Sequence, residues 1–147
     1  MVVPSSWGIR VLVCSAPLIV LTAGISAAAA QGSGDDRARA LAIEAGRDTF
    51  RQFCSPCHGR GAKGDGPVAP LLLTAPTDLT QVNRRNNGVF PAATFEAMLM
   101  LTRLQTNAHG SQQMPIWGTV FQSVDSSATL ARARVVNLLA YLESMQQ

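Results

Sequence analysis

Apolar side chains recur at helical spacing in three separate segments of the chain. The spacing predicts helices over 35–53, over 92–104, and from a cap at Asp125 or Ser126 to the C-terminus. The three apolar faces are formed by Leu41, Ala45, Thr49, Phe50 and Phe53; by Phe95, Met98, Leu99, Leu101 and Thr102; and by Leu130, Val135, Leu138, Leu139, Leu142 and Met145. Neither strand-like alternation nor an internal repeat interrupts this pattern, which therefore predicts a small all-α domain.

The connections between the predicted helices are long. Residues 59–92 are rich in proline and glycine, and residues 105–121 form a second loop. Loops of this length are uncommon in a compact domain unless they are functional. Three short helices would also bury little apolar area. A large buried prosthetic group would resolve both difficulties, because the loops could pack on it.

The first thirty residues have the pattern of an export signal. Arg10 precedes the apolar stretch Val11–Ile25, and small residues follow it at 26–30. We predict that residues 1–30 are a signal peptide cleaved after Ala30, with an uncleaved N-terminal anchor as the alternative. Cys14 would be discarded with this segment. Residues 31–40 then form a polar lead-in and residues 41–147 the folded domain, located in the periplasm.

Composition excludes several classes of protein. The 147 residues carry a formal charge of +3, which becomes +2 once Arg10 is lost with the leader, too little for a general nucleic-acid binder. A hydrophobic fraction of 47% excludes a disordered chain. No further apolar run approaches the ~18 residues that a membrane span requires. The 3 cysteines are too few for a disulfide scaffold, so the core needs another support.

The motif Cys54-x-x-Cys57-His58 is the attachment signature of a c-type haem. On one helical turn, the two thiols can each add across one haem vinyl group, and His58 can then bind the iron from the same face. A thioredoxin-like dithiol would require a strand before Cys54, which the pattern lacks. A zinc site would require four ligands, and only His109 could join this group. A Cys54–Cys57 disulfide would leave His58 unexplained.

Met114 is the expected sixth ligand of the iron. It lies in a loop directly before Pro115, which restricts it to extended geometry and favours a rigidly held thioether. His109, in the same loop, is the rival ligand, and its alternative role is that of a loop histidine near the haem edge. The other methionines after the leader, Met98, Met100 and Met145, are interpreted as packing or surface residues.

These motifs resemble those of the class I, mono-haem c-type cytochromes, and the resemblance runs from about Gly46 to Leu142. Its anchors are Gly46-x-x-x-Phe50-x-x-x-Cys54-x-x-Cys57-His58-Gly59, Gly64-Asp65-Gly66-Pro67-x-x-Pro70, Asp78-Leu79-Thr80, Gly88-x-Phe90-Pro91, Met114-Pro115-x-Trp117-Gly118 and Leu138-x-x-Tyr141-Leu142. The strings around Gly64 and Met114 look like those of bacterial periplasmic cytochromes.

The resemblance implies a cytochrome c fold, in which three to five short helices and long loops wrap around one covalent haem. It implies that the first and last helices cross where Gly46 and Phe50 meet Leu138 and Tyr141.

For the haem surroundings, the resemblance implies that the carbonyl of Pro70, or failing that Pro67, accepts the His58 Nδ1–H. It also implies that the indole of Trp117 donates to a haem propionate. Arg84 and Arg85 are interpreted as solvated loop side chains, with balance of a propionate charge as the alternative.

The expected function is that of an exported single-haem electron carrier, whose iron alternates between ferric and ferrous with His58 and Met114 bound. The expected partners are a redox donor and a redox acceptor, without nucleic acid or a small-molecule substrate, and a membrane only if the leader is uncleaved. The sequence contains no Ser/His/Asp or paired-carboxylate arrangement, so no enzymatic activity of its own is expected. The alternatives are a haem subunit of a periplasmic dehydrogenase or oxidase, and a ligand sensor with an open or His-ligated iron.

Overall fold

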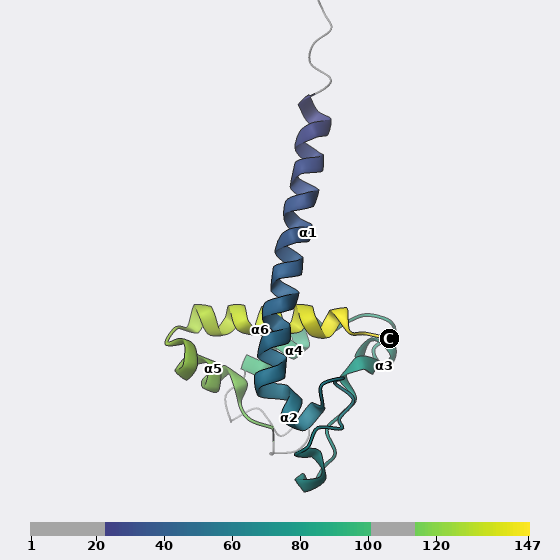
Figure 1. Ribbon diagram of the computed structural model, residues 1–147, viewed down its shortest axis with the longest axis vertical. Coiled ribbons are helices and arrows are strands. Elements are labelled where there is room, and N and C mark those ends of the chain that lie inside the picture. The colour runs from purple at the N-terminus through teal and green to yellow at the C-terminus, as the bar shows by residue number, and fades with distance from the viewer. Residues whose placement is uncertain (1–22, 101–113) are drawn as a thin grey trace, which may run out of the picture. The chain divides into compact units, whose positions relative to one another are not determined.

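The computed structural model describes residues 23–100 and 114–147, and every regular element in those two ranges is helical. The prediction of an all-α protein is therefore confirmed for this part of the chain (Figure 1). The residues of the core and of the candidate site all belong to one compact unit, Asp35–Gln147. Within the described residues, no helix is both long enough and apolar enough to cross a membrane.

The helix that leads into the Cys-x-x-Cys-His motif is longer than predicted. Helix α1 covers Ala23–Thr49, a π-helical turn η1 covers Phe50–Cys54, and α2 covers Ser55–His58. The helical backbone therefore runs through the expected polar lead-in at one end and through the whole motif at the other. Pro56 does not end it, because it lies in the first turn of α2, where a missing N–H costs little.

The segment between α2 and residue 92 has only short helical turns, as its proline and glycine content predicts. These turns are η2 (Ala69–Leu71), η3 (Leu79–Gln81) and α3 (Val82–Arg85). The chain first folds back on α2, where the N–H groups of Gly64, Gly66 and Val68 donate to the carbonyls of His58, Cys57 and Pro56 at 2.9, 3.1 and 2.9 Å. The carbonyls that the end of a helix leaves unpaired are thereby satisfied.

Gly66 allows this close approach of the loop to α2. A Cβ at this position would overlap the carbonyl of Pro56 and the backbone of Cys57. Gly64 has a φ of +83°, which a residue with a side chain rarely adopts. The two glycines of the Gly64-Asp65-Gly66 string are therefore required by the packing of the loop against the Cys54-x-x-Cys57-His58 motif.

Among the described residues after α3, the chain forms α4 (Ala92–Met100), α5 (Trp117–Asp125) and α6 (Ala128–Ser144). The expected helix over 92–104 is confirmed as far as Met100, and its last four positions lie outside the described residues. The expectation of a loop through Phe121 is wrong, since α5 begins at Trp117. Its apolar residues at 117, 120, 121 and 124 follow helical spacing and could have revealed it.

The cap of the last helix is also corrected. Asp125 ends α5, Ser126 takes a left-handed conformation with φ 52°, and Ser127 is the cap of α6. The Ser127 hydroxyl accepts a hydrogen bond from the Leu130 N–H at 3.4 Å. The predicted apolar face is largely correct, because Val135, Leu138, Leu139 and Leu142 are buried, whereas Leu130 is exposed.

Helix α6 lies across the C-terminal part of α1, as Figure 1 shows. At the crossing, a Cβ on Gly46 would overlap the carbonyl of Asn137, so only glycine allows this approach. The rings of Phe50 and Tyr141 lie beside it with centroids 5.5 Å apart. Phe50 and Leu138 are almost fully buried. The predicted crossing of the first and last helices at these residues is therefore confirmed.

The C-terminus is tied to the segment that contains η3 and α3. The Gln146 amide donates to the carbonyl of Leu79 at 2.9 Å and accepts from the N–H of Asn83 at 3.0 Å. The N–H of Gln147 donates to the carbonyl of Thr80 at 3.0 Å. These bonds hold in place a segment with little helical structure of its own, which forms part of the cavity described next.

Candidate functional site

The Cys-x-x-Cys-His motif opens onto a cavity of about 460 Å³. This volume lies within the ~300–1,000 Å³ typical of cofactor and small-molecule sites. Most of the lining is apolar and consists of Phe53, Leu72, Ala75, Pro76, Leu79, Val82, Pro91, Phe95, Met98, Leu99, Met114, Pro115, Trp117, Leu138 and Leu142. The remaining lining residues are Cys54, Cys57, His58, Thr74, Thr77, Arg85 and Asn86. Residues from α2, α3, α4, α5 and α6, and from the described segments between them, thus meet at one apolar space.

Both cysteines of the motif line the cavity as free thiols. Cys54 is buried, and this burial, together with the neighbouring Cys57, raises the pKa of its thiol to about 12. A dithiol oxidoreductase needs the opposite shift, because the thiolate is the attacking species. The local environment therefore disfavours a thioredoxin-like role for the pair.

The imidazole of His58 also lines the cavity and is held by the backbone. Its Nδ1 lies 3.4 Å from the carbonyl oxygen of Thr77. Because a carbonyl only accepts hydrogen bonds, Nδ1 carries the proton and Nε2 keeps its lone pair. Burial lowers the pKa of His58, and the hydrogen bond to Thr77 partly opposes that shift. The ring is thus held in the neutral form that a metal ligand requires.

The predicted acceptor for His58 was the wrong residue. Pro70 and Pro67 are both exposed, and Thr77, which follows Pro76 along the cavity wall, takes the role expected of Pro70. The reason is the path of the chain: residues 64–68 are already bonded to α2, and the segment that reaches His58 comes later. The spacing of residues along the sequence does not show which segment of the loop comes back to His58.

Met114 lines the cavity together with Pro115, and the residue is 41% exposed. Met98 lines the same cavity from α4 and is also partly buried against the hydrophobic core, in agreement with its interpretation as a packing residue. Met100 and Met145 are partly buried against the hydrophobic core, in agreement with that interpretation. His109 lies outside the described residues.

Trp117 lines the cavity as part of an aromatic cluster that we define as Phe53, Trp117 and Phe121. Trp117 stacks on Phe121 with centroids 5.5 Å apart, and Phe53 meets both rings edge-on at 5.8 and 5.3 Å. Phe53 directly precedes Cys54, and Trp117 follows Met114 by three positions. The aromatic cluster therefore joins the two ligand-bearing segments that the sequence predicts.

One side of the cavity wall is polar, and sequence reasoning found only part of it. Arg85 lines the cavity and donates to the carbonyl of Asp78 at 2.5 Å, whereas Arg84 is an exposed residue of the same helix. Asn86 also lines the cavity and donates to the carbonyl of Val89 at 2.7 Å. A cation and an amide at the wall of an apolar cavity suit a ligand that is apolar in its body and anionic at one end.

A metal site made by protein side chains alone receives no support from the described ranges, in which no three His, Cys, Asp or Glu residues gather. Comparison with known proteins adds no assignment, because no family model, no curated protein and no solved structure matches the chain.

Proposed function

We propose that the chain is an exported single-haem electron carrier with the fold of a class I c-type cytochrome. The observation that carries the proposal is the convergence of Cys54, Cys57, His58 and Met114 on one cavity. In this proposal Cys54 and Cys57 would hold the haem covalently, and His58 and Met114 would be the ligands of its iron. The partners are a redox protein that donates electrons and another that accepts them.

The cavity offers what a haem needs from its surroundings. Its apolar lining suits the macrocycle, and the free thiols supply the sulfur atoms for two thioether bonds. Arg85 and Asn86 would supply a charge and an N–H donor for the propionates, and Trp117, which also lines the cavity, would add an indole donor.

As ligands of a haem iron, His58 and Met114 would suit electron transfer. When bound, the haem supplies an iron that gains and loses one electron. The hydrogen bond from Nδ1 of His58 to Thr77 keeps the Nε2 lone pair available and orients the ring. Met114 supplies a thioether, which favours the ferrous state and raises the reduction potential. Because both side chains stay bound in both states, little has to rearrange when an electron moves.

Covalent attachment tests this proposal most simply. The full chain is expressed in cells that export it and attach haem to c-type cytochromes, and the product is denatured and stained for haem. The parent protein should keep its haem after denaturation, and Cys54→Ser/Cys57→Ser should lose it. Cys14→Ser is the matched control and should behave like the parent, because Cys14 lies in the predicted leader. A parent protein without bound haem would overturn the proposal.

A further inference from the structure

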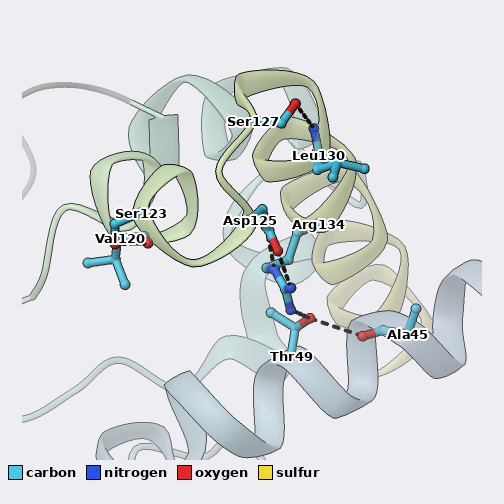
Figure 2. A network of polar contacts seen from close by, with 8 residues as sticks. All are labelled: Ala45, Thr49, Val120, Ser123, Asp125, Ser127, Leu130 and Arg134. Atoms are coloured by element: carbon cyan, nitrogen blue, oxygen red, sulfur yellow. Dashed lines mark hydrogen bonds and ion pairs between the residues drawn. The ribbon is translucent and has the colours of Figure 1, made fainter.

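The ion pair between Arg134 of α6 and Asp125 of α5 lies next to the aromatic cluster. Arg134 Nε and Nη2 donate to the two Asp125 carboxylate oxygens at 2.9 and 2.6 Å, so the pair is bidentate. The two side chains are only 28% and 12% exposed. Arg134 Nη1 reaches the hydroxyl of Thr49 at 3.5 Å, and that hydroxyl donates to the carbonyl of Ala45 (Figure 2). One guanidinium thereby connects α1, α5 and α6.

The same guanidinium lies over two rings of the aromatic cluster. Its central carbon is 5.6 Å from the centroid of Phe121 and 6.0 Å from that of Phe53. A partly desolvated cation at this distance is attracted to the face of an aromatic ring. Phe121 is fully buried, and Phe53 lines the cavity. Arg134 does not line the cavity itself, so any effect it has on the site passes through these rings or through Asp125 at the end of α5.

Met114 is connected to the start of α5 by a short stretch of chain. The residue is 41% exposed, so burial in the core does not fix its position. Three positions later α5 begins with Trp117, which is stacked on Phe121. At the other end α5 finishes with Asp125, which Arg134 holds. The start and the end of α5 are therefore both attached to groups that Arg134 contacts.

We infer that Arg134 is a positioning residue for the axial methionine: with Asp125 it fixes α5 and the aromatic cluster so that Met114 stays at the cavity. The inference rests on the proposed function. Arginine suits the position because its planar guanidinium can pair with a carboxylate along one edge and stack on rings with its face. Lysine could keep the charge but not this geometry.

Arg132 supplies a matched control on the same helix. It also forms an ion pair, with Nε 2.7 Å from a carboxylate oxygen of Glu96. The Arg132 side chain is 69% exposed, whereas that of Arg134 is 28% exposed. Loss of either arginine removes one charge and one ion pair of α6, but only the loss of Arg134 removes a contact with the aromatic cluster.

The test compares the exported, haem-loaded parent with Arg134→Met, Arg134→Lys and Arg132→Met. The readouts are the far-red Met–iron band of the oxidised protein, the reduction potential, and carbon monoxide binding to the reduced protein. Arg134→Met should weaken the band, lower the potential and raise the fraction of iron open to carbon monoxide about tenfold, the effect of ~1.4 kcal/mol. Arg134→Lys should give a smaller change, and Arg132→Met should match the parent.

Two results would overturn the inference. One is an Arg134→Met protein with the band, potential and carbon monoxide binding of the parent, even if it melts at a lower temperature. The other is an equal spectral change in Arg132→Met, which would indicate a general effect of charge. If Arg134→Met fails to accumulate, the same comparison is made with Arg134→Lys. A parent protein without a Met–iron band would instead contradict the proposed axial ligation itself, and the inference would fall with it.

Discussion

The imidazole of His58 is held by a carbonyl that lies 19 residues further along the chain. Spacing alone favours Pro70, but the loop first returns to bond with α2, and the segment around Thr77 is the one that closes on the ring. Residues whose role follows from chemistry, such as Cys54, Cys57 and Met114, could be assigned to the site from the sequence. Residues whose role depends on the path of a loop, such as Thr77 and Asn86, could not be assigned to it from the sequence.

Replacement of Met114 tests the axial ligand at this scale. Met114→Ala should open the reduced iron to carbon monoxide and lower the reduction potential by on the order of a tenth of a volt, within the ~0.8 V that axial ligands span. Met98→Ala is the matched control, because Met98 also lines the cavity but lies within α4. Redox titration and carbon monoxide difference spectra measure both effects.

The assignment of Met114 would be wrong if Met114→Ala behaved like the parent while Met98→Ala or His109→Ala lost the far-red band. Either result would assign the sixth ligand of the iron to the residue whose replacement removes the band.

The helices differ in how far their sequences determine them. The apolar face of α6 and its crossing with α1 could be predicted, because long periodicity and a glycine beside aromatic residues are strong local signals. Helix α5 was missed because it covers only Trp117–Asp125 and follows Pro115 directly after a loop. Its apolar periodicity is real but short, and its stability comes from packing against Phe53 and α6 rather than from propensity.

Gly46→Ala should destabilise the crossing of α1 and α6. Alanine gains ~1 kcal/mol of helix propensity over glycine, but its Cβ would overlap the carbonyl of Asn137, and relief of such overpacking costs about 1–3 kcal/mol or more. We expect the overlap to dominate and the melting temperature to fall by about 5–10 °C. Gly61→Ala is the control, since its Cβ would meet only the Lys63 side chain at 3.9 Å. A variant as stable as the parent would contradict the close crossing.

The ion pair between Asp125 of α5 and Arg134 of α6 should stabilise the fold less in acid. The hydrogen bonds and charge of Arg134 lower the pKa of Asp125 below its usual value. A carboxylate with a lowered folded-state pKa stabilises the fold above its unfolded pKa of about 3.9, and this contribution is lost as the pH falls through the folded value. Asp125→Asn should therefore melt below the parent at pH 7, and the difference should shrink as the pH falls below about 4.

Glu143→Gln is the control for this series, because the pair of Glu143 with Arg39 is exposed and should contribute little at any pH. A difference in melting temperature between Asp125→Asn and the parent that stays constant down to pH 2 would show that the ionised Asp125 does not stabilise the packing of α5 on α6.

At the scale of the whole molecule, the long loops and the scarcity of helices favoured a buried prosthetic group, and the structure places an apolar cavity of about 460 Å³ where those loops meet. That expectation could be formed from the sequence because long loops and a small apolar core need a further group to pack on. The shape of the cavity and the residues of its wall could not be predicted from the sequence. They depend on contacts between segments far apart in the chain, such as that between Leu79 and Gln146.

The most direct measurement is the visible spectrum of the mature, exported protein, oxidised, then reduced, then exposed to carbon monoxide. The account predicts sharp reduced c-type bands, a far-red Met–iron band in the oxidised protein, and no shift with carbon monoxide. A c-type spectrum that shifts strongly with carbon monoxide would contradict the His58/Met114 ligation and favour a ligand sensor. The absence of any haem spectrum, from cells able to attach haem, would contradict the central claim that the cavity holds a haem.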